Sequence, residues 1–178
     1  MSDGMEWIVR FDLPSGGAGP ERVTSDDLVA EYDAAVVLLL REHYCRVSRS
    51  RAQAYSDAHE QFEAADVGVV AALPDTIDRA GFWRDRYDLS IPVLSDTATE
   101  VDGPSVDAEA GEQALADGSP RFDAFAELET AVPSLPAVGV LDTRSDYPRL
   151  VHTAGGSSLQ DCPEPETALS TATDLLAE

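Results

Sequence analysis

Lysine is absent from this 178-residue chain, whose 12 basic residues are all arginine and face 34 aspartates and glutamates. The formal net charge is −22. Nucleic acids and anionic membranes bind basic protein surfaces, so this charge argues against both as partners. An acidic surface without lysine instead keeps a protein hydrated where salt screens charge repulsion. The composition predicts a haloarchaeal protein of a salt-loving cytoplasm, with an acidic protein from a GC-rich mesophile as the alternative.

Cysteine is scarce as well, with only Cys45 and Cys162 in the chain. Two cysteines do not make a disulfide scaffold, so thiol chemistry or two inert cysteines are expected instead. No apolar run approaches the roughly 20 residues of a membrane span, and the N-terminus lacks a signal-peptide pattern. Zinc, Walker and dinucleotide motifs are missing too. A cytoplasmic protein without metal or cofactor is therefore predicted.

The most informative stretch runs from Ala34 to Arg51. Its continuous apolar run over 34–40 predicts a strand buried on both faces. From Val47 onward, apolar residues recur at helical spacing, which predicts a helix to about Ala65. Cys45 therefore lies at a strand-to-helix turn, where the free amide groups and the dipole of the helix start favour a thiolate.

Arginine is concentrated around this cysteine. Four of the 12 arginines fall within one short segment, at positions 41, 46, 49 and 51. In so acidic a chain they form a local positive island, which also favours ionisation of the thiol. A buried, inert cysteine in a pocket at the helix start is the alternative.

The remaining pattern predicts one α/β domain over residues 1–178. Its strand, helix, strand, helix order over 34–87 predicts parallel pairing with a right-handed crossover. Ser25 is predicted to cap a short helix, and the acidic stretch 97–120 to form a surface insertion. Further strands are expected over 7–13, 91–94, 137–141 and 149–153, and further helices over 121–131 and 165–176.

Four motifs carry a family resemblance: FDLP at 11–14, HYC at 43–45, YDLSIPVLSD at 87–96 and LPAVGVLDT at 135–143. With the order of elements, they resemble the thioredoxin fold, and more closely its peroxiredoxin branch, the alkyl hydroperoxide reductase and thiol-specific antioxidant family. The resemblance covers roughly residues 8–178. It implies a central mixed β-sheet flanked by helices on both faces.

The resemblance also implies the chemistry of the site. Cys45 matches the peroxidatic cysteine, whose thiolate attacks a peroxide and becomes a sulfenic acid. Pro136 matches the proline that is cis in thioredoxin-like proteins and packs near the active thiol. Arg49, one turn into the helix, is predicted to stabilise the thiolate and the departing oxygen, with Arg46 as a second candidate. Ser48 is predicted to donate a hydrogen bond to the thiolate.

The sulfenic acid must then be resolved by a second thiol. Cys162, the partner subunit of a homodimer, and an external reducing thiol or thioredoxin-like donor are the three alternatives. Cys162 lies in the polar stretch SSLQDCPEPE, which predicts an exposed loop before the last helix.

The chain departs from the family pattern at several positions. Glu42 stands where peroxiredoxins usually carry threonine or serine, Leu38 replaces an upstream proline, and Ser48 makes the motif CxxS instead of CxxC. Another alignment makes Cys45 the second position of CxxC, with Glu42 replacing the nucleophile. Two further functions thus remain open: a monothiol disulfide-exchange protein, and an inactive thioredoxin-fold binding module.

Overall fold

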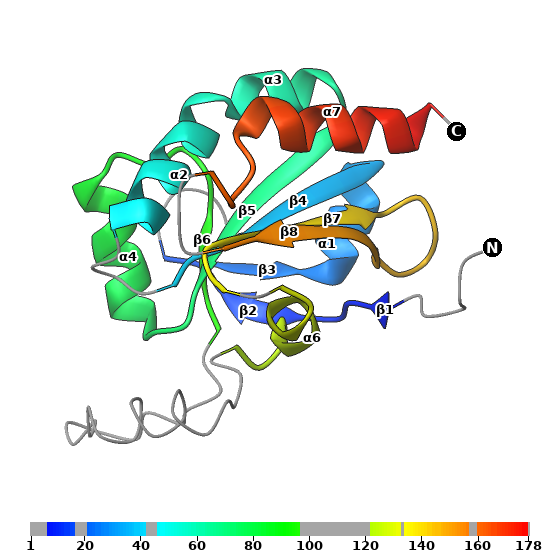
Figure 1. The fold of residues 1–178 in the computed structure, drawn as a ribbon. Helices are drawn as coiled ribbons and strands as arrows, with labels where there is room; N and C mark the ends of the chain where they lie inside the picture. Colours follow the sequence, from blue (N-terminus) through cyan, green and yellow to red (C-terminus); the bar gives the residue numbers. More distant parts are fainter. Residues whose placement is uncertain are drawn as a thin grey trace.

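The computed structural model describes residues 7–16, 21–41, 46–96, 122–132, 134–156 and 160–177. Its centre is a six-stranded sheet in the order β1-β8-β7-β4-β5-β6 (Figure 1). The central strand β4 (Ala34–Leu39) pairs parallel with β5 (Val67–Leu73) and antiparallel with β7 (Ala137–Asp142). The predicted mixed sheet is therefore confirmed.

The outer strands extend this centre on both sides. Beyond β5 lies the short parallel strand β6 (Val93–Ser95), and beyond β7 lies the antiparallel strand β8 (Arg149–Gly155). The two-residue strand β1 (Trp7–Ile8) pairs with the start of β8. Strands β2 (Asp12–Pro14) and β3 (Arg22–Thr24) form a separate two-stranded sheet.

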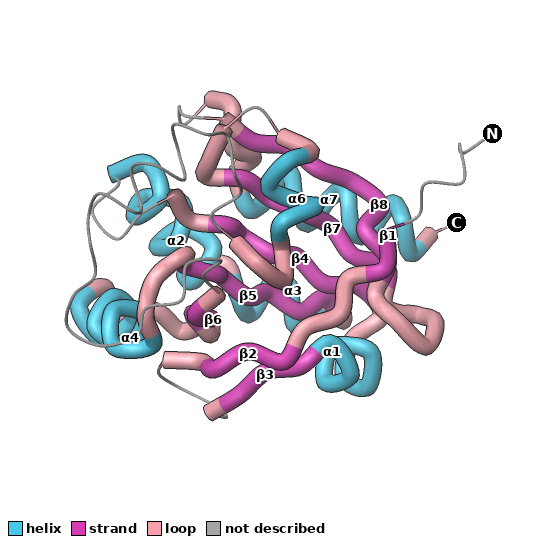
Figure 2. Tube along the Cα trace, turned by 90° about the horizontal axis from the view of Figure 1, so that it is seen from below, coloured by secondary structure: helices cyan, strands magenta, loops and turns pink. Residues whose placement is uncertain are grey.

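Helices cover both faces of the sheet, as predicted (Figure 2). One face packs against α2 (Arg46–Asp57), α3 (His59–Ala64), α4 (Ile77–Arg86) and α7 (Pro165–Leu176). The other face packs against α1 (Ser25–Glu31), α6 (Ala126–Thr130) and the small sheet.

Strand β4 separates two hydrophobic cores. Val36 and Leu38 point into the core under α2, α3 and α7, whereas Val37 and Leu39 point into the core under α1 and α6. Alternate residues of a strand face opposite sides of the sheet, so an apolar run fills both cores at once. All six residues of β4 are buried, which confirms the strand predicted from the run 34–40.

The N-terminal strand predicted over 7–13 is wrong as a single element. The chain forms β1 in the large sheet and β2 in the small one, with an irregular link between them. Within this link, Val9 donates its N–H to the carbonyl of Pro148, and the carbonyl of Phe11 accepts the N–H of Ser25. The segment therefore contacts two distant parts of the chain, which local alternation did not indicate.

The cap of α1 also differs from the prediction. Thr24 is the N-cap: its hydroxyl accepts the N–H of Asp27, whose carboxylate accepts the N–H of Thr24 in return. This reciprocal capping box satisfies two amide groups at the helix start. Ser25 is instead buried, and its hydroxyl hydrogen-bonds to the backbone of Phe11.

Two predicted helices are shorter than expected. The helix predicted from Val47 to Ala65 is divided at Ala58 into α2 and α3. Of the helix predicted over 121–131, the structure forms α6 alone. The preceding amide groups of residues 123–125 donate to the buried carboxylate of Asp96, so a distant side chain caps this segment. The predicted insertion over 97–120 lies outside the described residues.

Candidate active site

The junction between β4 and α2 is the centre of the predicted site. Strand β4 ends at Leu39 and helix α2 begins at Arg46. The predicted strand and helix are therefore confirmed on both sides of the turn. Cys45 immediately precedes the first residue of α2, but Cys45 and Glu42 themselves lie outside the described residues. The thiolate geometry of Cys45 stays a prediction.

Ser48 ties the two sides of this junction together. Its fully buried Oγ accepts the backbone N–H of Arg41, the residue with which the described part of the strand side ends, at 2.8 Å. The hydroxyl oxygen therefore fixes the start of α2 relative to the end of β4. Donation by the Ser48 O–H to the Cys45 thiolate stays a prediction.

The arginines of the positive island point in different directions. Arg49 is half-buried and lies over the ring of Tyr87, with its guanidinium carbon 5.6 Å from the ring centroid. This distance allows a cation–π interaction, which holds Arg49 against the end of α4. Arg46 is exposed at the first position of α2.

Arg51 is the buried arginine of the island, at 8% exposure. Its Nε donates to the carbonyl of Cys162 at 3.0 Å. One turn further along α2, the hydroxyl of Tyr55 donates to the carbonyl of Pro163 at 2.8 Å. Two side chains of α2 thus hold the segment before α7 through its backbone. The sequence pattern indicated only that Arg51 belongs to the island, because its partner lies more than 100 residues away.

Cys162 is buried, at 1% exposure, so the prediction of an exposed loop is wrong. Burial raises the pKa of its thiol to about 12, against the opposing influence of Arg51. The polar sequence around Cys162 suggested exposure because the prediction used local composition alone. The contacts from Arg51 and Tyr55, more than 100 residues earlier, are what turn this cysteine inward.

Pro136 lies at the same end of the sheet as the β4–α2 junction. The Leu135–Pro136 peptide bond is cis, as the resemblance implied. Pro136 directly precedes β7, and its neighbour Ala137 pairs with Leu39, the last residue of β4. The structure therefore brings Pro136 next to the strand end that leads to Cys45.

The described ranges contain neither a candidate metal cluster nor a helix that could span a membrane. There, no three His, Cys, Asp or Glu side chains are grouped closely enough to hold a metal ion. Each helix within those ranges is too short or too polar to cross a bilayer.

The sheet order, the helices on both faces and the cis proline beside a strand-to-helix turn define a thioredoxin-like α/β protein. The AhpC/TSA family matches residues 8–103, which is more than half of the chain. The chain therefore belongs to the AhpC/TSA family, the family that the sequence motifs resemble.

Solved structures of peroxiredoxins share the fold at low sequence identity. Peroxidoxin BcpB from Mycobacterium tuberculosis is 14% identical with a TM-score of 0.59, covering 97% of this chain and 95% of that chain. AhpC from Enterococcus faecalis is 11% identical with a TM-score of 0.64, covering 97% and 94%. A yeast mitochondrial 1-Cys peroxiredoxin is 12% identical with a TM-score of 0.63, covering 96% and 74%. No curated protein matches the chain significantly in sequence.

Proposed function

We propose that this protein is a thiol peroxidase that reduces peroxides through Cys45. The observation that carries the proposal is the position of Cys45 directly before α2, at the sheet end where cis Pro136 lies. Amide groups at a helix start stabilise a neighbouring anion, so they lower the cost of forming the thiolate. Membership of the AhpC/TSA family supports a peroxide as substrate and a thiol as reductant.

The reaction follows from thiolate chemistry. The sulfur of Cys45 attacks the terminal oxygen of the peroxide, an S–O bond forms and the O–O bond breaks. Cys45 becomes a sulfenic acid, and the departing oxygen takes a proton and leaves as water or an alcohol. Arg49 and Arg46 are proposed to stabilise the charge on the departing oxygen, and Ser48 to hydrogen-bond the thiolate.

Resolution of the sulfenic acid is proposed to use an external thiol or thioredoxin-like donor first. Arg51 lies five residues after Arg46, so the Cys162 segment contacts α2 about 7.5 Å along the helix from its start. The Cys162 segment thus lies beside α2, but its thiol is buried and is held protonated by its raised pKa. Resolution by Cys162 would require Arg51 and Tyr55 to release the segment. A partner subunit of a homodimer is the third source of a resolving thiol.

Disulfide exchange through a single thiol is the second candidate function. The thioredoxin-like fold supports it, because Cys45 directly precedes α2, where a helix start favours the thiolate that attacks a disulfide. Ser48 occupies the position of the second cysteine in the CxxC pattern, so this position cannot form a disulfide with Cys45. An inactive binding module remains the third hypothesis.

The proposed setting is the cytoplasm of a salt-loving organism, most simply a haloarchaeon. The observation that supports it is the lysine-free chain with a net charge of −22. At molar salt the Debye length falls to about 3 Å, so such a surface no longer repels itself strongly. Loss of activity on removal of salt is the expected result.

Stopped-flow oxidation by hydrogen peroxide tests the peroxidase function. The Cys162→Ser variant leaves Cys45 as the only thiol, and the reaction is followed in molar potassium chloride. A rate constant orders of magnitude above that of a free thiol is expected, with no reaction in a matched Cys45→Ser variant. A rate equal to that of a free thiol would overturn the peroxidase proposal. Disulfide exchange, in which Cys45 forms a mixed disulfide with its substrate, would then be the next reaction to test.

A further inference from the structure

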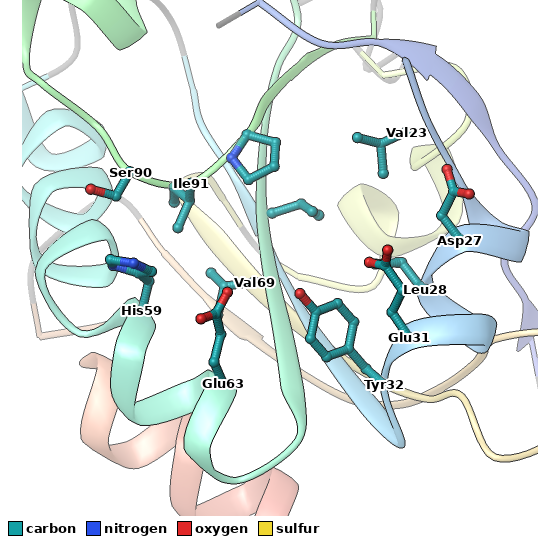
Figure 3. Close-up of a pocket in the computed structure, with 12 residues that line it drawn as sticks. Val23, Asp27, Leu28, Glu31, Tyr32, His59, Glu63, Val69, Ser90 and Ile91 are labelled. Carbon is teal, nitrogen blue, oxygen red and sulfur yellow. The ribbon is translucent and has the colours of Figure 1, made fainter. Parts of the chain in front are cut away.

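A cavity of about 420 Å³ lies at the uncovered edge of β5, separate from the thiol site. Strand β6 pairs with β5 only at Ala71–Leu73, so no described strand lies beside Val69 and Val70 on that side. Helix α1 packs on one face of the sheet and α3 on the other, and the cavity opens between them (Figure 3).

The floor of the cavity is apolar, and the backbone N–H and C=O groups of one residue, Val69, face it. Its apolar residues come from four segments: Val23, Leu28, Val69, Val70, Ile91 and Pro92. The N–H of Ala71 points outward to the carbonyl of Pro92 at 2.9 Å. Backbone groups two residues apart in a strand point the same way, so the N–H and C=O of Val69 also face this edge.

The rim is acidic from both sides. Glu63 and His59 project from α3, and Asp27, Glu31 and Tyr32 project from α1 and its end across the opening (Figure 3). Asp27 accepts the N–H of Thr24 in the capping box, whereas Glu31 and Glu63 lie on opposite sides of Tyr32 at the rim (Figure 3). None of the described lining residues is an arginine.

Tyr32 lies between Glu31 of α1 and Glu63 of α3 at the rim (Figure 3). Its ring packs on Gly68, where a Cβ atom would come within 2.6 Å of the ring. Burial raises the pKa of the Tyr32 hydroxyl, and the charges of Glu31, Glu63 and Asp66 raise it further. Carboxylates of α1 and α3 therefore act on one hydroxyl at the centre of the rim.

The chemistry of the lining selects the ligand. The carboxylates of the rim repel anions, and no three acidic or histidine side chains of the described residues are close enough to chelate a metal ion. A volume near 420 Å³ is in the range of sites for small organic molecules, which combine an apolar wall with a few polar groups. An ammonium group joined to an apolar body satisfies the rim and the floor together.

The geometry points to a binding site for a small amphipathic amine, its ammonium between Glu31 and Glu63 and its apolar body against Val69 and Ile91. The site is independent of the proposed peroxidase function, because it lies beside Val36 and Val37 of β4 and not at the Leu39 end.

The test is a titration with 2-phenylethylamine, followed through the methyl NMR signals of Leu28, Val69 and Ile91, at the lowest potassium chloride concentration at which the ligand-free protein keeps its folded spectrum, because molar salt would screen the ion pair. The matched anion 3-phenylpropionate and the neutral 2-phenylethanol control for charge. We expect the amine alone to shift these methyl signals. Glu63→Gln should weaken its binding about threefold to fivefold, the effect of losing one partly exposed ion pair.

Glu60→Gln is the control variant, because Glu60 is exposed on α3 and does not line the cavity. It should leave the binding of the amine unchanged. Tyr32→Phe keeps the ring on Gly68 and should weaken binding less than Glu63→Gln. An unchanged methyl spectrum of each ligand-free variant shows that it is folded.

Three outcomes would overturn the inference. The first is that the methyl signals do not move up to about 10 mM amine, a concentration that corresponds to negligible affinity. The second is that Glu60→Gln weakens binding as much as Glu63→Gln. The third is that spermidine, which has charge without an apolar body, shifts the same signals equally, since general attraction of cations would then explain the binding.

Discussion

Replacing Asp142 by asparagine should lower the free energy of unfolding at pH 7, by an amount that shrinks in acid. Asp142 ends β7, and its side chain is 2% exposed. Its Oδ1 accepts the Nε–H and the backbone N–H of Arg144, at 3.0 and 3.1 Å. Its Oδ2 accepts one N–H each from Arg144 and Arg149, at 3.0 and 2.9 Å. A buried carboxylate thus joins both sides of the β7–β8 hairpin.

The magnitude follows from the pKa of this carboxyl group. Hydrogen bonds from Arg144, helped by Arg149, lower the pKa of Asp142 from 3.8 to about 2, against the opposing effect of burial. A difference of this size corresponds to about 2.4 kcal/mol of stability at neutral pH. Both arginine side chains are about one third exposed, at 37% and 33%, so water screens part of it. We expect about 2 kcal/mol.

The sign of the pH dependence is set by the lowered pKa. The stabilisation is fully present above the unfolded pKa of 3.8 and is lost as the pH falls through 2. At pH 3, about half of it should remain. Asparagine cannot ionise, so the variant lacks this dependence.

Urea unfolding of the wild type and Asp142→Asn, at one salt concentration and from pH 7 to pH 3, measures the difference. Taking the difference removes the titration of the other carboxylates. Asp146→Asn is the matched control, because Asp146 is exposed in the same turn. A difference that stays constant down to pH 3, or an equal loss in the control, would refute the argument.

Three further predictions concern single contacts. In a Cys45→Ser variant, Cys162 should react with iodoacetamide at pH 8 about three orders of magnitude more slowly in the native protein than in urea. The reason is that its raised pKa of about 12 leaves little thiolate. Comparable rates in the native and the unfolded protein would contradict its burial. Ser48→Ala should cost about 1–3 kcal/mol in urea unfolding, since the N–H of Arg41 loses its buried acceptor; a neutral variant would argue against that bond. Gly68→Ala should cost about 1–3 kcal/mol through its clash with Tyr32, and Tyr32→Ala should remove most of this penalty in a double-mutant cycle; additive losses would place the ring elsewhere.

The local sequence pattern predicted the elements whose own residues show the spacing or composition of a strand or a helix. The apolar run over 34–40 was sufficient for β4, because a strand buried on both faces needs apolar residues at every position. Likewise, helix α7 and the hairpin of β7 and β8 were predicted from the spacing of apolar residues and from turn residues. The order of these elements, with the motifs around them, indicated the family that the match over residues 8–103 confirms.

Contacts between distant segments decided the rest. Cys162 has a polar neighbourhood in the chain, yet it is buried because Arg51 and Tyr55 bind the carbonyl groups of its segment. Similarly, the amide groups of Ala124 and Phe125, just before α6, donate to the carboxylate of Asp96, a distant side chain. Neither partner can be identified from local periodicity.

The amine cavity shows the same limit most clearly. Two carboxylates of its rim, Glu31 and Glu63, are separated in the chain by β4, by α2 and by the first part of α3. The sequence by itself determined the central strand, the helix after it and the position of Cys45 before that helix, because a continuous apolar run and helical spacing are local properties. Only the tertiary structure decided that Cys162 is buried and that acidic side chains of α1 and α3 line one cavity, because both depend on how segments distant in the chain pack against each other.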